Sequence, residues 1–153
     1  MGKETLRIIS PNGHLGFAPT KEGSFYIGAA THPDYYCCDS GSDDIGPVPL
    51  GMDKCASHPD WQYHDLELML LAAREQGVPM IIGSAGDTGT NSRVDMYVDM
   101  IRDMAKKHGL KKFKLAYFYS EVDKEYLRRK MLAGEKIEGL NSRSDLTIEE
   151  LDA

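Results

Sequence analysis

The run Gly83-Ser84-Ala85-Gly86-Asp87-Thr88-Gly89-Thr90-Asn91 combines small, polar and acidic side chains in a way that suits ligand binding. It follows an apolar stretch typical of a strand and precedes a segment with helical periodicity. Backbone N–H groups in such a loop can converge on an anion, and the positive end of the helix dipole adds to the attraction. We therefore predict a site for a carboxylate or a phosphate. The expected contacts are Ser84, Gly86, Thr88, Gly89, Thr90 and Asn91.

The same run does not support two common nucleotide cofactors. It lacks the lysine of the P-loop, and its spacing G-x-x-G-x-x-G differs from the dinucleotide fingerprint G-x-G-x-x-G, so neither ATP nor NAD is expected. Asp87 would repel a phosphate unless its carboxylate bound a hydroxyl group, a cation or a proton in transfer. The alternative is structural: a glycine turn between strand and helix, with Ser84 and Thr90 as caps.

A second run, Asp39-Ser40-Gly41-Ser42-Asp43-Asp44, brings several carboxylates together. Clustered carboxylates repel one another and need a cation, hydrogen bonds or raised pKa values. Asp39, Asp43 and Asp44 are candidate ligands for a hard cation such as Mg²⁺, although the EF-hand pattern is missing. The alternatives are loop capping by the aspartates and acid–base catalysis by Asp39 or Asp43, with Ser40 as a substrate contact.

His14 is the best histidine candidate for catalysis. Imidazole titrates near neutral pH and can carry protons. The neighbouring glycines Gly13 and Gly16 would let the backbone approach a ligand closely, so Asn12 and Gly13 are candidate substrate contacts. The alternative is an ordinary surface histidine.

The cysteines do not form a convincing metal site. Cys55-x-x-His58 has the spacing of a ligand pair, but Cys37 and Cys38 adjoin on an expected strand and face opposite sides. We predict buried, unreactive thiols. The chain has 3 cysteines and begins without an apolar signal region, so we expect reduced thiols and a cytoplasmic location.

The chemical runs follow segments that read as strands, and helical segments separate them. The expected strands are 6–9, 34–39, 78–82 and 113–119. The expected helices are 21–31, 57–76, 90–109 and 120–132. Most have start or stop signals, and in the second of them Ser57 is the expected N-cap and Gly77 the stop.

The order β-α-β-α-β-α-β-α predicts an α/β fold with a parallel sheet and right-handed crossovers. We expect an open, doubly wound sheet of the Rossmann or flavodoxin type, with half of a TIM-type barrel as the alternative. Loops after the carboxyl ends of parallel strands meet at one edge of the sheet. His14, Asp39 or Asp43, and Asp87 should therefore lie together.

Length and charge limit the class of protein. The 153 residues fit one α/β domain over 1–134 and a tail over 135–153, where Thr147-x-x-Glu150 begins a further element. We expect a segment of a longer protein, or a subunit completed by a partner or a second copy, with exposed apolar surface from Leu110 onward. A net charge of −6 and the lack of a long apolar run argue against nucleic-acid and membrane partners.

Four stretches of the chain resemble the N-terminal part of the acyclic terpene utilisation AtuA family, a domain of unknown function. They are the run Ser-Pro-Asn-Gly-His-Leu-Gly-Phe from Ser10, Asp-Ser-Gly-Ser-Asp-Asp-Ile-Gly-Pro from Asp39, Ile-Gly-Ser-Ala-Gly-Asp-Thr-Gly-Thr from Ile82, and Tyr-Ser-Glu-Val-Asp-Lys from Tyr119. The resemblance covers most of residues 5–132 and implies a metabolic enzyme, with a link to acyl-CoA intermediates. It supplies no catalytic residues.

The functional expectation is a cytoplasmic enzyme domain or subunit that acts on a small carboxylate or an acyl-CoA. Lyase or hydratase chemistry fits best, with His14 and one of Asp39, Asp43 or Asp87 moving protons. The alternative is a non-catalytic subunit that binds a ligand or assists assembly of a larger enzyme. The substrate and any cofactor are not identified by the sequence.

Overall fold

The structure is a computed structural model that describes residues 4–41, 47–141 and 143–153. The chain divides into two compact units, Met1–Tyr119 and Ser120–Ala153, called here the first and second unit. No helix in these described ranges is long and apolar enough to cross a membrane.

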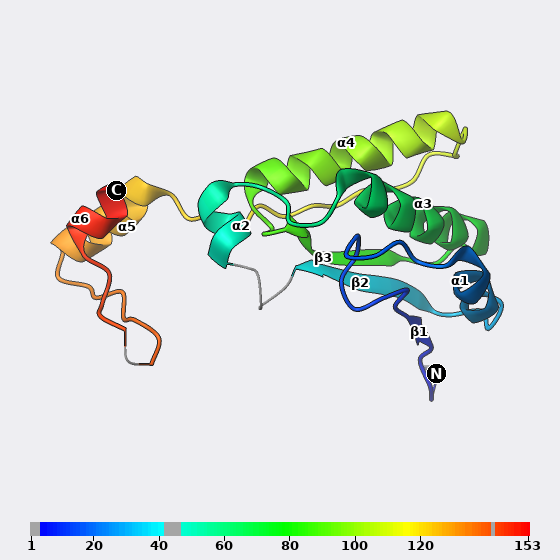
Figure 1. Cartoon of the computed structure of the whole chain (residues 1–153), viewed down its shortest axis with the longest axis horizontal. Coiled ribbons are helices and arrows are strands. Elements are labelled where there is room, and N and C mark those ends of the chain that lie inside the picture. The colour runs from blue at the N-terminus through cyan, green and yellow to red at the C-terminus, as the bar shows by residue number, and fades with distance from the viewer. Residues whose placement is uncertain (1–3, 42–46, 142) are drawn as a thin grey trace. The chain divides into compact units, whose positions relative to one another are not determined.

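The first unit is built on a parallel sheet of 3 strands in the order β1-β2-β3. The strands are β1 (Ile8–Ile9), β2 (Tyr35–Gly41) and β3 (Met80–Asp87). Ile8 pairs with Tyr35, and Tyr36 pairs with Met80. The chain therefore has a mixed α/β fold with an open parallel sheet (Figure 1).

A fourth strand over 113–119 is not formed. This segment carries no strand assignment; its first residues line a pocket together with Met80 at the start of β3. The segment pairs with none of the three strands of the described sheet. Phe118 in this segment is 84% exposed. The expected four-strand order is thus reduced to three strands within the described residues.

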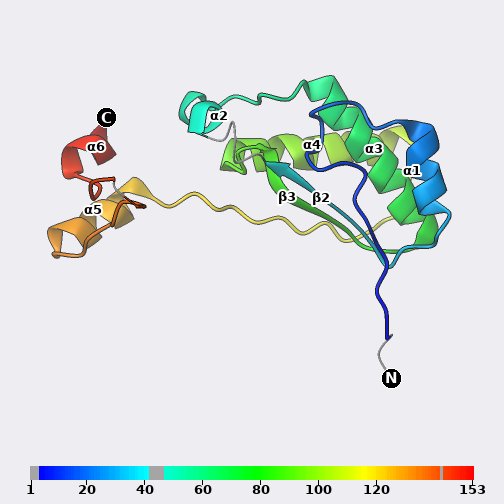
Figure 2. The same cartoon turned by 60° about the horizontal axis from the view of Figure 1, so that its bottom comes forward.

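Three long helices pack on one face of the sheet (Figure 2). They are α1 (Glu22–Ala29), α3 (Pro59–Gln76) and α4 (Asn91–Lys107). The short helix α2 (Pro47–Met52) lies in the connection between β2 and α3. The strand order contains no reversal among the described strands, and a reversal is what marks a doubly wound sheet.

Local signals explain where α3 begins and ends. His58 is the N-cap and its Nδ1 accepts a hydrogen bond from Asp60 N, while Pro59 opens the helix. Gly77 ends the helix in the left-handed region at φ 69°. Ser57, expected to be the N-cap, is one residue too early for this role and is used elsewhere.

The core lies between the helices and the alternate residues of β2 and β3 that face them. Tyr36, Leu66, Met69 and Met104 are fully buried there. Ser40 on the same face donates to or accepts from Tyr97 of α4, at 2.6 Å between the oxygens. The opposite face of the sheet is open, and Ile8 and Ile81 are each 55% exposed on it.

The second unit contains α5 (Lys124–Leu132) and α6 (Ile148–Asp152). The expected capping box is present, because Thr147 Oγ1 accepts from Glu150 N at 3.2 Å and Glu150 Oε2 accepts from Thr147 N at 2.9 Å. Arg128 forms an ion pair with Asp152 and so joins the two helices. None of the side chains of α5 is buried.

The buried carboxylate of Asp65 attaches the loop after β1 to α3. It accepts hydrogen bonds from Asn12 Nδ2 at 2.8 Å, Gly16 N at 3.1 Å and Thr20 N at 2.7 Å. Gly16 has φ 83°, and a Cβ there would overlap the side chain of Gln62. The loop that carries His14 is therefore held tightly against α3.

Replacing Asp65 by Asn should lower the free energy of unfolding by about 2–3 kcal/mol, because the substitution leaves buried N–H donors without a carboxylate. Urea unfolding followed by circular dichroism measures the change. Asp99→Asn, at an exposed carboxylate on α4, is the matched control and should change the stability by less than about 0.5 kcal/mol. Equal effects of the two substitutions would show that Asp65 does not anchor the loop.

Candidate functional site

The glycine run after β3 is a bulged strand end and not a free loop. β3 extends through Asp87, whereas the sequence pattern ended this strand at Ile82. The pairing of β2 with β3 is irregular here, since Asp39 pairs with Gly83 and Gly41 pairs with Asp87. A bulge bends the strand and redirects side chains.

The backbone of the bulge lies partly in the left-handed region. Ser84 has φ 45° and Asp87 has φ 71°, conformations that cost a non-glycine residue about 1–2 kcal/mol. Gly86 has φ 60°, and a Cβ there would press on Arg93 and Met96. The bulge turns the Asp87 carboxylate into the interior, where the side chain is 0% exposed.

The Asp87 carboxylate is surrounded by hydrogen-bond donors from two other parts of the first unit. Its Oδ1 lies 2.6 Å from His14 Nε2 and accepts from Ser57 Oγ at 2.8 Å. Its Oδ2 accepts from Ala56 N at 2.7 Å and Ser57 N at 3.0 Å, with Gln62 Nε2 at 3.4 Å. Every one of these contacts satisfies an ionised carboxylate, which can only accept.

This environment assigns the protons of the His14 ring. Nε2 faces the Asp87 oxygen at 2.6 Å and the Ser57 hydroxyl at 3.2 Å, so Nε2 carries the hydrogen in the neutral ring. Nδ1 is then the nitrogen with the lone pair. The His14 side chain is 12% exposed and stacks on Phe17, with the ring centres 5.7 Å apart. An oriented imidazole of this kind can act as a general base.

Of the residues predicted from the loop after β1, only His14 reaches Asp87. Asn12 uses its side chain inside the loop: Nδ2 donates to Asp65 and to Thr20 Oγ1, and Oδ1 accepts from His14 N. Gly13 is exposed, and nothing lies within 4 Å of where its Cβ would be. Asn12 thus shapes the loop, and Gly13 leaves open space beside it.

The acidic run does not join the His14–Asp87 pair within the described residues. Asp39 lies on the open face of the sheet, and its Oδ1 accepts from Gly41 N at 2.9 Å. Ser40 points into the core toward Tyr97. Asp43 and Asp44 lie outside the described residues. In the part of the chain that is described, no group of at least three His, Cys, Asp or Glu side chains could hold a metal ion.

The predicted anion position at the start of α4 contains a carboxylate of the chain itself. Asp53 Oδ1 accepts from Ser92 Oγ at 3.0 Å and lies 3.4 Å from Thr90 Oγ1. Arg93 Nη2 also donates to the Asp53 backbone oxygen and lies 3.4 Å from its Oδ1. An external anion at this helix end would have to displace Asp53.

The remaining members of the predicted anion site are distributed around this helix start. Thr88 Oγ1 lies 3.2 Å from Thr90 Oγ1, and Gly89 N donates to Ala85 O at 2.9 Å. Ser84 is exposed on the bulge, and Asn91 is the first residue of α4. The backbone donors of Gly83–Gly86 belong to the strand end and do not form an open cradle.

Sequence reasoning missed Ser57 and Gln62 as parts of the site. Ser57 was interpreted as a helix cap, yet its hydroxyl bridges His14 and Asp87. Gln62 is 0% exposed, and its Oε1 has no hydrogen-bond partner within the described residues. The available signal was their position at the start of α3, directly after a long connection, where buried polar side chains serve a site or a cap.

A scan against protein-family models, a search of curated proteins and a search of solved structures found no match to this chain.

Cys38 and Cys55 are not activated nucleophiles. All three are free, and Cys38 is buried. Burial raises the pKa of the Cys38 thiol, and burial likewise raises the pKa of Cys55, whose Sγ donates to Gly86 O at 3.5 Å. A raised pKa reduces the fraction of thiolate at neutral pH.

Alkylation of Cys38 and Cys55 should accordingly be slow at pH 7 in the folded protein and should still be accelerating above about pH 9. Iodoacetamide labelling followed by peptide mass spectrometry resolves each thiol. The urea-unfolded chain is the control, since there all three should react at the rate of an ordinary thiol. Rapid labelling of folded Cys55 at pH 7 would contradict this reading and would make it a candidate nucleophile.

Proposed function

We propose that this chain is an enzyme domain or subunit in which His14 is the general base and Asp87 is its orienting carboxylate. The 2.6 Å contact between His14 Nε2 and Asp87 Oδ1 carries the proposal. The buried carboxylate would stabilise the imidazolium that forms when Nδ1 takes a proton, as in other histidine–carboxylate pairs. Ser57 and the backbone N–H groups before α3 would keep Asp87 in place.

The proposed substrate is a small carboxylate or an acyl-CoA, and the proposed reaction is of the lyase or hydratase type. In an elimination, His14 Nδ1 takes the proton from the carbon next to the carbonyl, the double bond forms, and a hydroxyl leaves on the next carbon. The hydroxyl needs a proton to leave as water. Asp43, which lies outside the described residues, is the proposed donor, because Asp39 lies on the open face of the sheet, away from His14. A divalent cation such as Mg²⁺ near Asp39, Asp43 and Asp44 is proposed only as an additional factor.

The topology favours one of the two expected architectures. Sequential strand order with the helices on one face is what a segment of a (β/α) barrel has, whereas a doubly wound sheet reverses its order. We propose that the enzyme is assembled as a homo-oligomer or with a partner subunit or domain. The resemblance to the AtuA family and the three free thiols support, as proposals, a metabolic role and a cytoplasmic location.

A ligand-binding or assembly role without catalysis is the second proposal. The open face of the sheet favours it, since Ile8 and Ile81 expose apolar surface where a closed α/β fold would be covered. In this case His14 and Asp87 would bind a ligand and would not transfer protons.

Deuterium exchange at the carbon next to the carbonyl tests the catalytic proposal directly. The protein is incubated in D₂O with a panel of small carboxylates and acyl-CoA esters, with and without Mg²⁺, and exchange is followed by NMR. His14→Ala and Asp87→Asn should each lower the exchange rate on the accepted substrate by about 10²–10⁴-fold. His58→Asn, which keeps an N-cap on α3, should leave the rate unchanged.

Two results would count against catalysis. Exchange that is equally fast in His14→Ala and in the wild type would remove His14 as the base. Thermal stabilisation by a carboxylate, lost in both substituted proteins but unaccompanied by exchange with any substrate, would support the ligand-binding proposal instead.

A further inference from the structure

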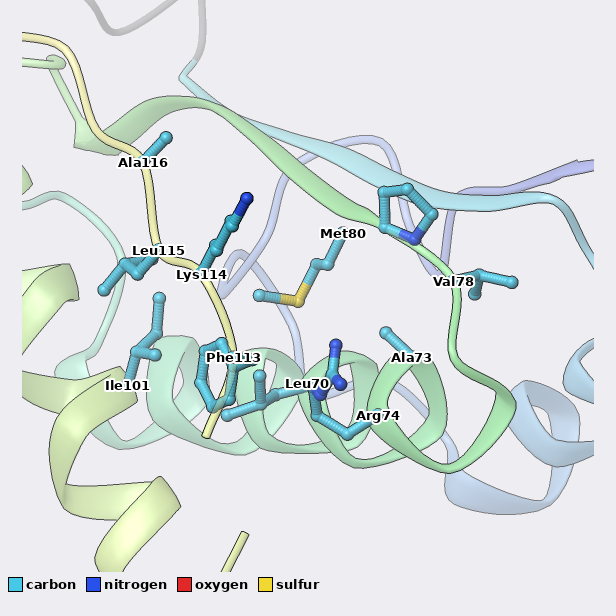
Figure 3. A pocket seen from close by; sticks show the side chains of 11 residues that line it. Leu70, Ala73, Arg74, Val78, Met80, Ile101, Phe113, Lys114, Leu115 and Ala116 are labelled. Atoms are coloured by element: carbon cyan, nitrogen blue, oxygen red, sulfur yellow. The ribbon is translucent and has the colours of Figure 1, made fainter. Parts of the chain in front are cut away.

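A pocket of about 230 Å³ opens beside the first residues of β3 (Figure 3). Its walls come from α3, α4, the start of β3 and the segment 113–116, and include Leu70, Met80, Ile101 and Phe113. Met80 and Asp87 stand at opposite ends of β3, roughly 20 Å apart along an extended strand. The pocket is therefore separate from the His14–Asp87 site.

Two cationic side chains line this apolar pocket, Arg74 from α3 and Lys114 from the segment 113–116. Neither forms an ion pair with an Asp or Glu among the residues that the structure describes, although the chain has a net charge of −6. Figure 3 shows Arg74 on α3 and Lys114 on the segment 113–116, on different walls of the pocket. The pocket thus combines mostly apolar lining residues with positive charge that no Asp or Glu among the described residues neutralises.

A structural role explains only one of these cations. Arg74 lies in the last turn of α3, where a cation interacts favourably with the helix dipole, and its guanidinium stacks over the Phe113 ring at 5.1 Å. Lys114 lies in an extended segment with neither relation. Mostly apolar lining residues with two cations that have no ion pair among the described residues match a ligand that has an apolar body and one anionic head group.

We infer that this pocket binds a small amphipathic carboxylate. An apolar cavity of about 150 Å³ is large enough for benzene, so a pocket of about 230 Å³ accommodates a somewhat larger apolar group. Octanoate has the required properties: its chain would lie against Leu70, Met80 and Ile101, and its carboxylate would lie between Arg74 and Lys114. This inference does not depend on the proposed function of His14 and Asp87.

Isothermal titration calorimetry of the full chain with octanoate is the test. Octanol, which lacks the charge, and inorganic phosphate, which lacks the apolar body, should each bind at least about tenfold more weakly. The double substitution Arg74→Gln/Lys114→Gln should weaken octanoate binding by about tenfold or more. Lys111→Gln, at an exposed lysine that does not line the pocket, should bind octanoate as the wild type does.

A second variant distinguishes loss of octanoate binding from loss of folding. Ala116→Phe fills the pocket from the exposed segment and retains both cations, so octanoate binding should be lost while circular dichroism is unchanged. His14→Ala should retain the binding, which separates this pocket from the proposed catalytic site. The inference is overturned if octanoate does not bind, if all variants bind it equally, or if hydrogen exchange shows 113–119 paired with β3 and the pocket closed.

Discussion

The burial of the Asp87 carboxylate is the constraint on which the arrangement of the first unit depends. An ionised carboxylate without partners in the interior would cost several kcal/mol or more, so the fold must supply donors to both of its oxygens. His14 and Ser57 satisfy Oδ1, and backbone N–H groups before α3 satisfy Oδ2. One buried charge therefore fixes the end of β3, the loop after β1 and the entry to α3 in a single geometry.

Asp65 is a second buried carboxylate that accepts several hydrogen bonds. Its partners are all within the loop from Asn12 to Thr20, so its hydrogen bonds are used to shape the chain. Asp65 and Gln62 are three positions apart on α3 and share its buried side. Through Asp65, α3 holds the loop that carries His14, and through Gln62 it contacts the Asp87 carboxylate. The Asp87 network ends in the partly exposed imidazole of His14, a group that can accept a proton.

One face of the sheet in the first unit is covered by helices, and the other face is open. Phe25 of α1 packs on Tyr36, and Tyr97 of α4 bonds to Ser40, so the even positions of β2 are covered by helices. Cys37 and Ile81 point the other way and are only partly covered. A parallel sheet is normally buried on both faces. Further protein surface against the open face would bury it in the usual way, and this agrees with the proposed role as a domain or subunit.

The sequence by itself determined the elements with strong local signals. Pro59, the apolar periodicity and Gly77 define α3. The recurrence of apolar residues at helical spacing defines α4, and both signals depend on interactions within a few residues. The capping box at Thr147 was predictable for the same reason. The pairing of His14 with Asp87 could be expected only as proximity, from the rule that loops after parallel strands share an edge.

Only the tertiary structure decided which atoms meet. The bulge between Asp39 and Gly41 arises from the pairing of β2 with β3, and it turns Asp87 inward while Asp39 remains on the open face. Ser57 contacts His14, which is 43 positions away in the sequence. Asp53 contacts Ser92 of α4, which is 39 positions away. The strand expected at 113–119 did not form, since a strand depends on pairing with a neighbour as well as on the β propensity of its own residues. Such long-range contacts leave no periodicity in the sequence, and for this reason the fold alone determines them.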